Sequence, residues 1–294
     1  MAANKSFPMN RTTLAALALL AIATSSSSVA AEIVIADGRT QPENLTVTPD
    51  GDVIVGSFTT PVISRVRKDG TTAETFVDLT NDGGGTTLGV LSDPANGTLW
   101  ACQSTAGAGG RTTHLRGFDL KTGAAKLRWT LPSPSTCNDF AVAPDKSLYV
   151  ADTSGKIYRL PAGAADATLV LDGQVVAGID GIAFFNGALY YNSIFSGKVY
   201  RVPLDASGKA GTPVEITLDQ PLNGPDGMRP GGNLLFVAEQ RANRIVSLAF
   251  TGDSAKVTVV KDSLLRPTGV QPDGNTLWYA ELTPGRITSM PISQ

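Results

Sequence analysis

The sequence predicts an all-β fold, and within that class a six-bladed β-propeller with four antiparallel strands in each blade. Gly and Pro are frequent, with 31 and 18 residues among 294, and they punctuate short apolar runs as turns punctuate strands. No helical periodicity of any length follows residue 31. The third observation is an internal repeat of about 40–50 residues, which is the period of propeller blades.

Each repeat contains a turn, then an apolar run and a further strand-like segment. The turns are TPDGD (48–52), DPANG (93–97), APDKS (143–147), FFNGA (184–188), RPGGN (229–233) and QPDGN (271–275). Aligning the repeats on these turns places six residues in one column, namely Glu43, Leu88, Asn138, Asp180, Asp226 and Thr268. Since the first strand of each blade lines the channel of a propeller, we expect these residues to form a ring at one mouth of the channel.

The two ends of the chain are expected to meet in the last blade. Five repeats contain a segment typical of a fourth strand, whereas the sixth ends at Gln294 without one. The segment EIVIA (32–36) precedes the first repeat and has no blade of its own. We therefore expect it to supply the outer strand of the last blade, which would close the ring and remove an exposed edge.

Residues 1–31 have the composition of a secretory signal peptide. Lys5 and Arg11 form a basic start, LAALALLAIA (14–23) is an apolar stretch, and small residues precede the expected cleavage site. The apolar stretch is too short to span a bilayer comfortably, which disfavours the alternative of an anchored helix. We expect one domain over residues 32–294, secreted or periplasmic, with no membrane span once the signal is removed.

The charge balance restricts the classes of partner. Charged residues make up 17% of the chain and the net charge is −2. This near-neutral balance gives no electrostatic footprint for nucleic acid or for an anionic membrane. We expect a monomer whose partner is a small molecule.

The chain has two cysteines, Cys102 and Cys137. An even count in an oxidising compartment permits one disulfide. Cys102 is predicted to end the second strand of one blade and Cys137 to precede the first strand of the next. Both are then expected at the same mouth of neighbouring blades, and we predict that they pair.

The chemistry of the column indicates a cation site. Glu43, Asp180 and Asp226 would bring three carboxylates into a narrow space, where like charges repel and burial raises their pKa values. A bound cation would resolve this conflict, and with Asn138 the ligand set would consist of oxygen atoms only. Such a set favours Ca²⁺, with Mg²⁺, Mn²⁺ or Zn²⁺ as alternatives. The competing interpretation is that these polar residues only cap the starts of strands.

Four segments resemble the gluconolactonase and senescence-marker-protein-like (regucalcin-like) propellers, and more distantly the paraoxonases. They are PENLTVTPDG (42–51), CNDFAVAPDKSLYVADT (137–153), GIDGIAFFNGALYYNS (178–193) and GPDGMRPGGNLLFVAE (224–239). The resemblance implies a divalent cation on the propeller axis, and many members hydrolyse lactones. It also implies that Glu43 and Asp226 are metal ligands, that Asn138 approaches the metal or the substrate, and that Asp226 serves as a base.

The sequence departs from that family at two positions. Asp180 stands where the family usually has asparagine, which adds a negative charge to the predicted metal site. Thr136 stands where sugar-lactone members commonly have arginine, so the expected donor to sugar hydroxyls is missing. This second departure argues against an aldonolactone substrate.

Two functions follow from these observations. The first is a metal-dependent lactonase or esterase, in which the cation polarises the carbonyl and Asp226 or Asp180 activates water. The alternative is a non-catalytic propeller that binds a ligand or partner at the channel mouth, with a structural metal. The intact ligand set favours the enzyme, while the missing arginine and the lack of a histidine pair favour the binding protein.

Four further residues are weaker candidates. His114 is the only histidine, and its place in a third strand predicts a structural or surface role. Asp152, Asn192 and Glu239 end second strands near the same mouth. We expect them at solvated loop positions rather than in the pocket.

Overall fold

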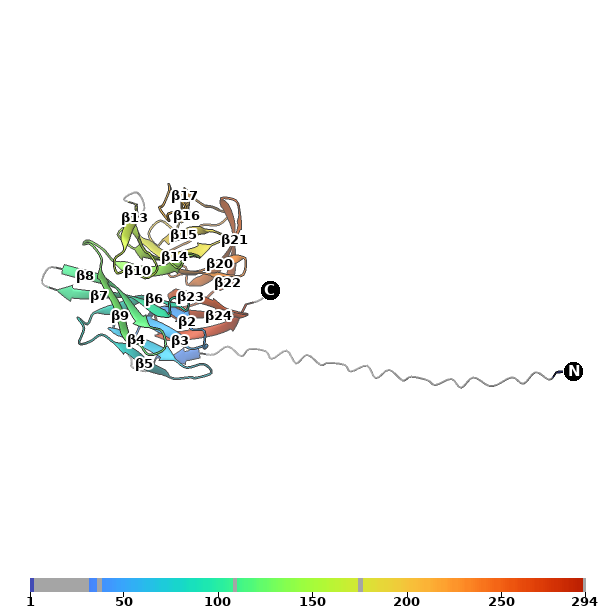
Figure 1. Ribbon diagram of the computed structural model, residues 1–294, viewed down its shortest axis with the longest axis horizontal. Coiled ribbons are helices and arrows are strands. Elements are labelled where there is room, and N and C mark those ends of the chain that lie inside the picture. The colour runs from blue at the N-terminus through green and yellow to red at the C-terminus, as the bar shows by residue number, and fades with distance from the viewer. Residues whose placement is uncertain (3–31, 36–38, 108–109, 174–176, 293–294) are drawn as a thin grey trace.

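The computed structural model describes residues 1–2, 32–35, 39–107, 110–173 and 177–292. The predicted signal peptide beyond its first two residues therefore lies outside the described residues. Within the described ranges the chain is all-β and its strands pair into five sheets (Figure 1). No helix in these ranges is long and apolar enough to cross a membrane.

Most strands belong to antiparallel meanders, in which consecutive strands pair side by side. The first meander contains β2 (Pro42–Val47), β3 (Val53–Ser57), β4 (Val62–Val66) and β5 (Ala73–Asp78). The second contains β6 (Thr86–Asp93), β7 (Thr98–Gly107), β8 (Gly110–Asp119) and β9 (Ala125–Thr130). A single bridge between Ser57 and Thr87 joins these two meanders into one sheet. Because of this bridge, the strand pairings give five sheets for six meanders. The number of six blades therefore stays a prediction.

The remaining meanders follow the same order along the chain. The third contains β10 (Cys137–Val142), β11 (Leu148–Asp152), β12 (Lys156–Leu160) and β13 (Thr168–Asp172), and the fourth β14 (Ile179–Phe185), β15 (Ala188–Ser193), β16 (Val199–Val202) and β17 (Val214–Glu215). The fifth contains β19 (Pro225–Gly231), β20 (Leu234–Glu239), β21 (Arg244–Thr251) and β22 (Ser254–Lys261). The sixth contains β23 (Pro267–Asp273), β24 (Thr276–Glu281), β25 (Arg286–Pro291) and β1 (Glu32–Val34).

The first strands of the meanders surround a central channel. Each contacts the first strand of the next meander, in the order β2, β6, β10, β14, β19 and β23, and β23 contacts β2 again. The second strands lie behind them and are mostly apolar up to a polar last residue, as in VIVGS and LYVAD, which are buried at every position. Both faces of these strands pack against neighbouring meanders, which explains why their apolar residues do not alternate with polar ones.

The core lies between adjacent meanders. One cluster packs Tyr190 and Val199 of the fourth meander against Val237, Val246 and Leu248 of the fifth. Burying each of these side chains contributes about 1.5–3 kcal/mol. The meanders are thus held together chiefly by apolar packing between the faces of adjacent sheets.

The N-terminal strand closes the ring as predicted. β1 pairs antiparallel with β25, from Glu32 opposite Thr288 to Val34 opposite Arg286. Ile33 is fully buried in this position and packs with Val55 and Ile287. The edge that the last meander would otherwise expose is therefore covered.

The outer strand of the fourth meander, in the segment TPVEITL (212–218), is divided instead of forming the single fourth strand expected of each repeat. Val214–Glu215 pairs with β16, whereas β18 (Thr217–Leu218) pairs in parallel with β22 of the next meander. The change occurs at Ile216, whose buried side chain packs between the fourth and fifth meanders. This buried anchor explains why the strand divides there.

The predicted cysteine pair is a disulfide in the structure. The Cα atoms of Cys102 and Cys137 lie 5.4 Å apart, within the range that a bridge requires. Cys102 does not end its strand as expected, because β7 continues to Gly107 and forms a long hairpin with β8. This hairpin projects beyond the neighbouring strands in Figure 1.

Candidate functional site

The six residues of the sequence column come together in one pocket. Its volume is about 250 Å³, and it lies at one mouth of the channel. Its floor contains all members of the column, namely Glu43, Leu88, Asn138, Asp180, Asp226 and Thr268. The alignment on turns therefore identified positions that are equivalent in space as well as in sequence.

A β-bulge places each column residue. In every first strand the pairing with the second strand shifts at the column position, for example between Cys137 and Phe140 and between Pro225 and Met228. A bulge bends the strand and re-aims a side chain. The repeated bulge explains how residues from six strands line one pocket.

The position after the column is restricted to small or special residues. It holds Gly89, Gly181, Gly227 and Gly269 in four strands, with Asn44 and Asp139 in the other two. A Cβ atom at Gly89 would lie 1.8 Å from the carbonyl oxygen of Asn138, and one at Gly181 would lie 2.3 Å from that of Asp226. Neighbouring backbones approach so closely that a side chain fits at only a few of these positions.

The three column carboxylates form a buried acidic triad. One carboxylate oxygen from each of Glu43, Asp180 and Asp226 lies within 4.8 Å of the others, and the residues are 6%, 4% and 4% exposed. Oε2 of Glu43, Oδ1 of Asp180 and Oδ1 of Asn138 are buried and have no hydrogen-bond partner among the described residues. The amide nitrogen of Asn138 instead donates to Oγ1 of Thr153 at 3.3 Å. Four oxygen-bearing side chains thus converge with unused acceptor capacity.

Burial dominates the electrostatics of the triad. It raises the pKa of Asp180 to about 7 and raises the pKa values of Glu43 and Asp226 well above their ordinary range. The charge of Asp180 raises both of the latter further. The metal-free triad therefore retains protons near neutral pH, as expected for carboxylates that share one buried space.

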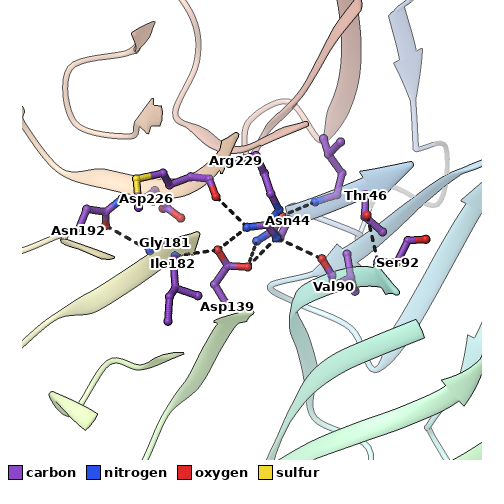
Figure 2. A network of polar contacts seen from close by, with 12 residues as sticks. Asn44, Thr46, Val90, Ser92, Asp139, Gly181, Ile182, Asn192, Asp226 and Arg229 are labelled. Atoms are coloured by element: carbon purple, nitrogen blue, oxygen red, sulfur yellow. Dashed lines mark hydrogen bonds and ion pairs between the residues drawn. The ribbon is translucent and has the colours of Figure 1, made fainter. Parts of the chain in front are cut away.

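A neutralised ion pair lies in the channel next to the triad. Nη1 and Nη2 of Arg229 each donate to an oxygen of Asp139 at 2.7 Å, and the residues are 4% and 0% exposed. Asn44 and the backbone N–H of Ile182 donate to the same carboxylate at 3.1 and 3.3 Å. Figure 2 shows these side chains meeting between the first strands. Asp139, Arg229 and Asn44 were not predicted from the sequence. Asn44 and Asp139 could have been found, because they are the two residues other than glycine at the position after the column.

The wall of the pocket uses a second repeated position, the residue that directly follows the second strand. This position holds Phe58, Thr153, Ile194, Gln240 and Leu282. Nε2 of Gln240 donates to Oδ2 of Asp226 at 3.0 Å, and its Oε1 accepts from Arg266 at 3.4 Å. Gln240, also not predicted, therefore orients the carboxyl group of Asp226.

The prediction of solvated positions for Asp152, Asn192 and Glu239 is wrong, because all three are fully buried. Asp152 accepts from the backbone N–H of Thr136 at 2.7 Å, and Glu239 accepts from that of Asn223 at 2.6 Å. Both carboxylates thereby fix the loop that leads into a first strand.

Asn192 and His114 also have structural contacts. Asn192 donates to the carbonyl of Asp226 at 2.7 Å and accepts from the N–H of Gly181 at 3.2 Å, so it joins two first strands below the triad. His114 lies outside the pocket, with Nδ1 at 2.9 Å from Oγ1 of Thr130 and Nε2 accepting from Arg128 at 3.1 Å. Burial lowers the pKa of His114. Both residues contribute to packing rather than to the pocket surface.

Comparisons with known proteins extend these observations only at the level of the fold. No protein-family model and no curated protein matches the sequence. The structure is similar to a gluconolactonase from Xanthomonas campestris, with a TM-score of 0.67, 16% identity, and 89% of each chain covered. It is also similar to virginiamycin B lyase from Staphylococcus aureus, with a TM-score of 0.62, 18% identity, and 90% of this chain and 99% of that chain covered.

A luciferin-regenerating enzyme has a TM-score of 0.65 and 14% identity, with 89% of this chain and 95% of that chain covered. The structural similarity shows that the chain has the propeller-type fold of these enzymes. At identities this low, it shows nothing beyond the fold. Because such folds carry many chemistries, the function depends on the site itself.

Proposed function

We propose that the protein is a metal-dependent hydrolase of lactones or related esters, built on a six-bladed propeller and exported from the cytoplasm. The observation that carries this proposal is the buried triad of Glu43, Asp180 and Asp226 at the floor of an open pocket. Three carboxylates with raised pKa values, two of which have an oxygen without a partner among the described residues, are costly to bury without a ligand. Perturbed groups of this kind concentrate at functional sites.

The residues of the floor fit a hard divalent cation. Glu43, Asp180 and Asp226 would hold it through carboxylate oxygens and Asn138 through its amide oxygen. Within the described ranges, Oε2 of Glu43 and the Oδ1 atoms of Asn138 and Asp180 have no hydrogen-bond partner. An all-oxygen set of irregular geometry suits Ca²⁺. When bound, the cation would polarise the substrate carbonyl and stabilise the oxyanion.

The chain's own residues would move the proton. In the hydrolysis, the oxygen of water forms a bond to the carbonyl carbon, the acyl–oxygen bond breaks, and the leaving oxygen is protonated, which yields a hydroxy acid from a lactone. We assign the acceptance of the water proton, and its return to the leaving oxygen, to Asp226, with Asp180 as the second candidate. Gln240 holds Asp226 in place through the 3.0 Å hydrogen bond to Oδ2.

A substrate panel tests this proposal. Purified protein would be assayed against unsubstituted lactones, sugar lactones and aryl esters, with added Ca²⁺ and with chelator. We expect turnover that requires the cation and falls by at least about 100-fold in Asp226→Asn, since general base catalysis contributes about 10²–10⁴-fold. Asp262→Asn, which changes an exposed acid, serves as the control and should retain activity.

The alternative is a propeller that binds a ligand without turning it over. The pocket lining favours this alternative in one respect, since it contains no histidine among the described residues. Cation binding with no hydrolysis of any member of the panel would contradict the hydrolase and support a binding protein with a structural metal.

A further inference from the structure

The pocket above the triad continues sideways into a second cavity of about 420 Å³. The two cavities share four lining residues, namely Arg111, Thr136, Thr153 and Phe195. The second cavity is completed by the segment Ser133–Ser135 and by Ser154. Because they share a wall, the two cavities form one elongated cleft that is longer than a single lactone ring requires. We call the second cavity the side subsite.

Thr136 lies where the two cavities meet. Its backbone N–H donates to Oδ1 of Asp152 at 2.7 Å, which fixes the loop before β10. Asp152 also accepts from the N–H of Ser154 at 2.9 Å, so the same buried carboxylate holds both sides of the connection. A threonine side chain is short enough to leave this connection open, whereas an arginine at this position would extend across it.

The side subsite combines one apolar and one cationic side chain. Phe195 is 62% exposed, although it is a large apolar residue, and it lines both cavities. Arg111 of β8 is exposed as well, and its side chain forms no hydrogen bond or ion pair with any described residue. An arginine without a carboxylate partner, in a cavity that an exposed aromatic ring also lines, is suited to bind an anion from outside the protein.

The surroundings of the side subsite are also electropositive. Its lining contains no carboxylate within the described ranges. Nζ of Lys156 donates to the carbonyl of Pro134, one of the lining residues, at 3.4 Å. An anionic group is therefore favoured here, while the acidic triad at the other end of the cleft would repel it.

We infer that the substrate is a lactone or ester with an extended substituent that ends in a carboxylate. The ring lies over the triad, the substituent passes Thr136 and contacts Phe195, and the terminal carboxylate pairs with Arg111. This inference rests on the proposed function for the identity of the ring, but the side subsite itself is argued from independent residues.

Matched compounds test the inference. A γ-lactone with a short alkyl side chain ending in a carboxylate would be compared with the same lactone ending in a primary amide, and with unsubstituted γ-butyrolactone. Binding is measured by calorimetry with chelator present, so that turnover does not interfere. We expect the carboxylate compound to bind at least about tenfold more tightly than the amide, because hydrogen bonds to charged groups exceed neutral ones.

Variants identify the residues responsible. Arg111→Ala should abolish the preference for the carboxylate, and Thr136→Arg should weaken binding of both substituted lactones. Lys256→Ala, which removes an exposed positive charge on β22, is the matched control and should leave the preference unchanged. Equal binding of carboxylate and amide, the absence of binding, or an unchanged preference in Arg111→Ala would overturn the inference.

The proposed function is tested separately by turnover of γ-butyrolactone, which does not reach the side subsite. If the metal-loaded protein hydrolyses γ-butyrolactone but the binding test shows no preference for the carboxylate compound, the proposed hydrolase is supported and the side subsite is contradicted. If the carboxylate compound binds more tightly but no lactone is hydrolysed, the side subsite is supported as a binding site and the proposed hydrolase is contradicted.

Discussion

Two groups of buried acids occupy the same channel and differ in how their charge is balanced. Asp139 accepts hydrogen bonds from both terminal nitrogens of Arg229, from Asn44 and from the N–H of Ile182. Among the described residues, no basic side chain forms a hydrogen bond or ion pair with the adjacent triad, and Oε2 of Glu43 and Oδ1 of Asp180 have no hydrogen-bond partner. The difference separates an acid that completes the fold from acids that require a ligand.

The largest effect is expected from breaking the balanced pair. Arg229→Leu would leave Asp139 buried without its countercharge, which should lower the free energy of unfolding by about 3–5 kcal/mol. Denaturant unfolding of the metal-free protein measures this loss. Adding Asp139→Asn should recover part of the loss, because it removes the unpaired charge.

The control for this prediction is Arg201→Leu. Arg201 pairs with Asp253 at 2.6 Å, but both side chains are partly exposed, so the expected cost is about 0–1 kcal/mol. Equal losses in the free energy of unfolding for Arg229→Leu and Arg201→Leu would show that the buried Arg229–Asp139 pair contributes no more to stability than an exposed pair.

The next effect is stabilisation by a cation at the unbalanced triad. Ca²⁺ at about 100 times its dissociation constant should stabilise the chelator-treated protein by about 2.7 kcal/mol. Asp226→Ala should abolish the shift in melting temperature, and Asp180→Asn should reduce it, because an amide oxygen still coordinates. Identical melting with and without millimolar Ca²⁺, Mg²⁺, Mn²⁺ or Zn²⁺ would show that the triad is not a metal site.

The metal-free triad should also make stability depend on pH. Burial raises the pKa of Asp180 to about 7, so the folded state binds a proton that the unfolded state releases at a lower pH. Stability should therefore fall as pH rises from about 4 to 7, by at most about 1.4 kcal/mol per pH unit for each such proton. Asp180→Asn should flatten this dependence when melting is followed from about pH 4 to 7. A slope that is unchanged in Asp180→Asn would assign the dependence to other groups.

The fold and the floor of the pocket could be predicted because both follow the repeat. The turns fixed the register of the strands, and the bulge is in register with the turns, so one alignment found Glu43, Asn138, Asp180 and Asp226. The N-terminal strand followed from the need to cover an edge.

Residues outside that column could not be found in the same way. Arg229 lies three residues after the column residue Asp226, and no other first strand has an arginine at this position. Asp139 is paired only because Arg229 reaches it from a different meander. Asp152 and Glu239 appeared solvated, since a sequence does not show which backbone N–H groups approach a carboxylate. These contacts depend on how meanders pack against one another, and no local pattern contains that information.

The smallest effect concerns Asp226, which is intermediate between the two groups of acids. It receives one side-chain donor, Nε2 of Gln240 at 3.0 Å, whereas Asp139 receives four hydrogen bonds. Gln240→Met keeps the length of the side chain and removes the donor, so we expect a loss of about 1 kcal/mol in stability. Because the carboxylate is then less firmly oriented, kcat on a hydrolysed lactone should fall by up to about tenfold with little change in KM. Gln220→Met, which removes a glutamine that donates to the carbonyl of Val257 at 3.3 Å away from the pocket, controls for the loss of a surface amide. If the two variants match in both stability and kcat, the hydrogen bond from Gln240 does not position Asp226.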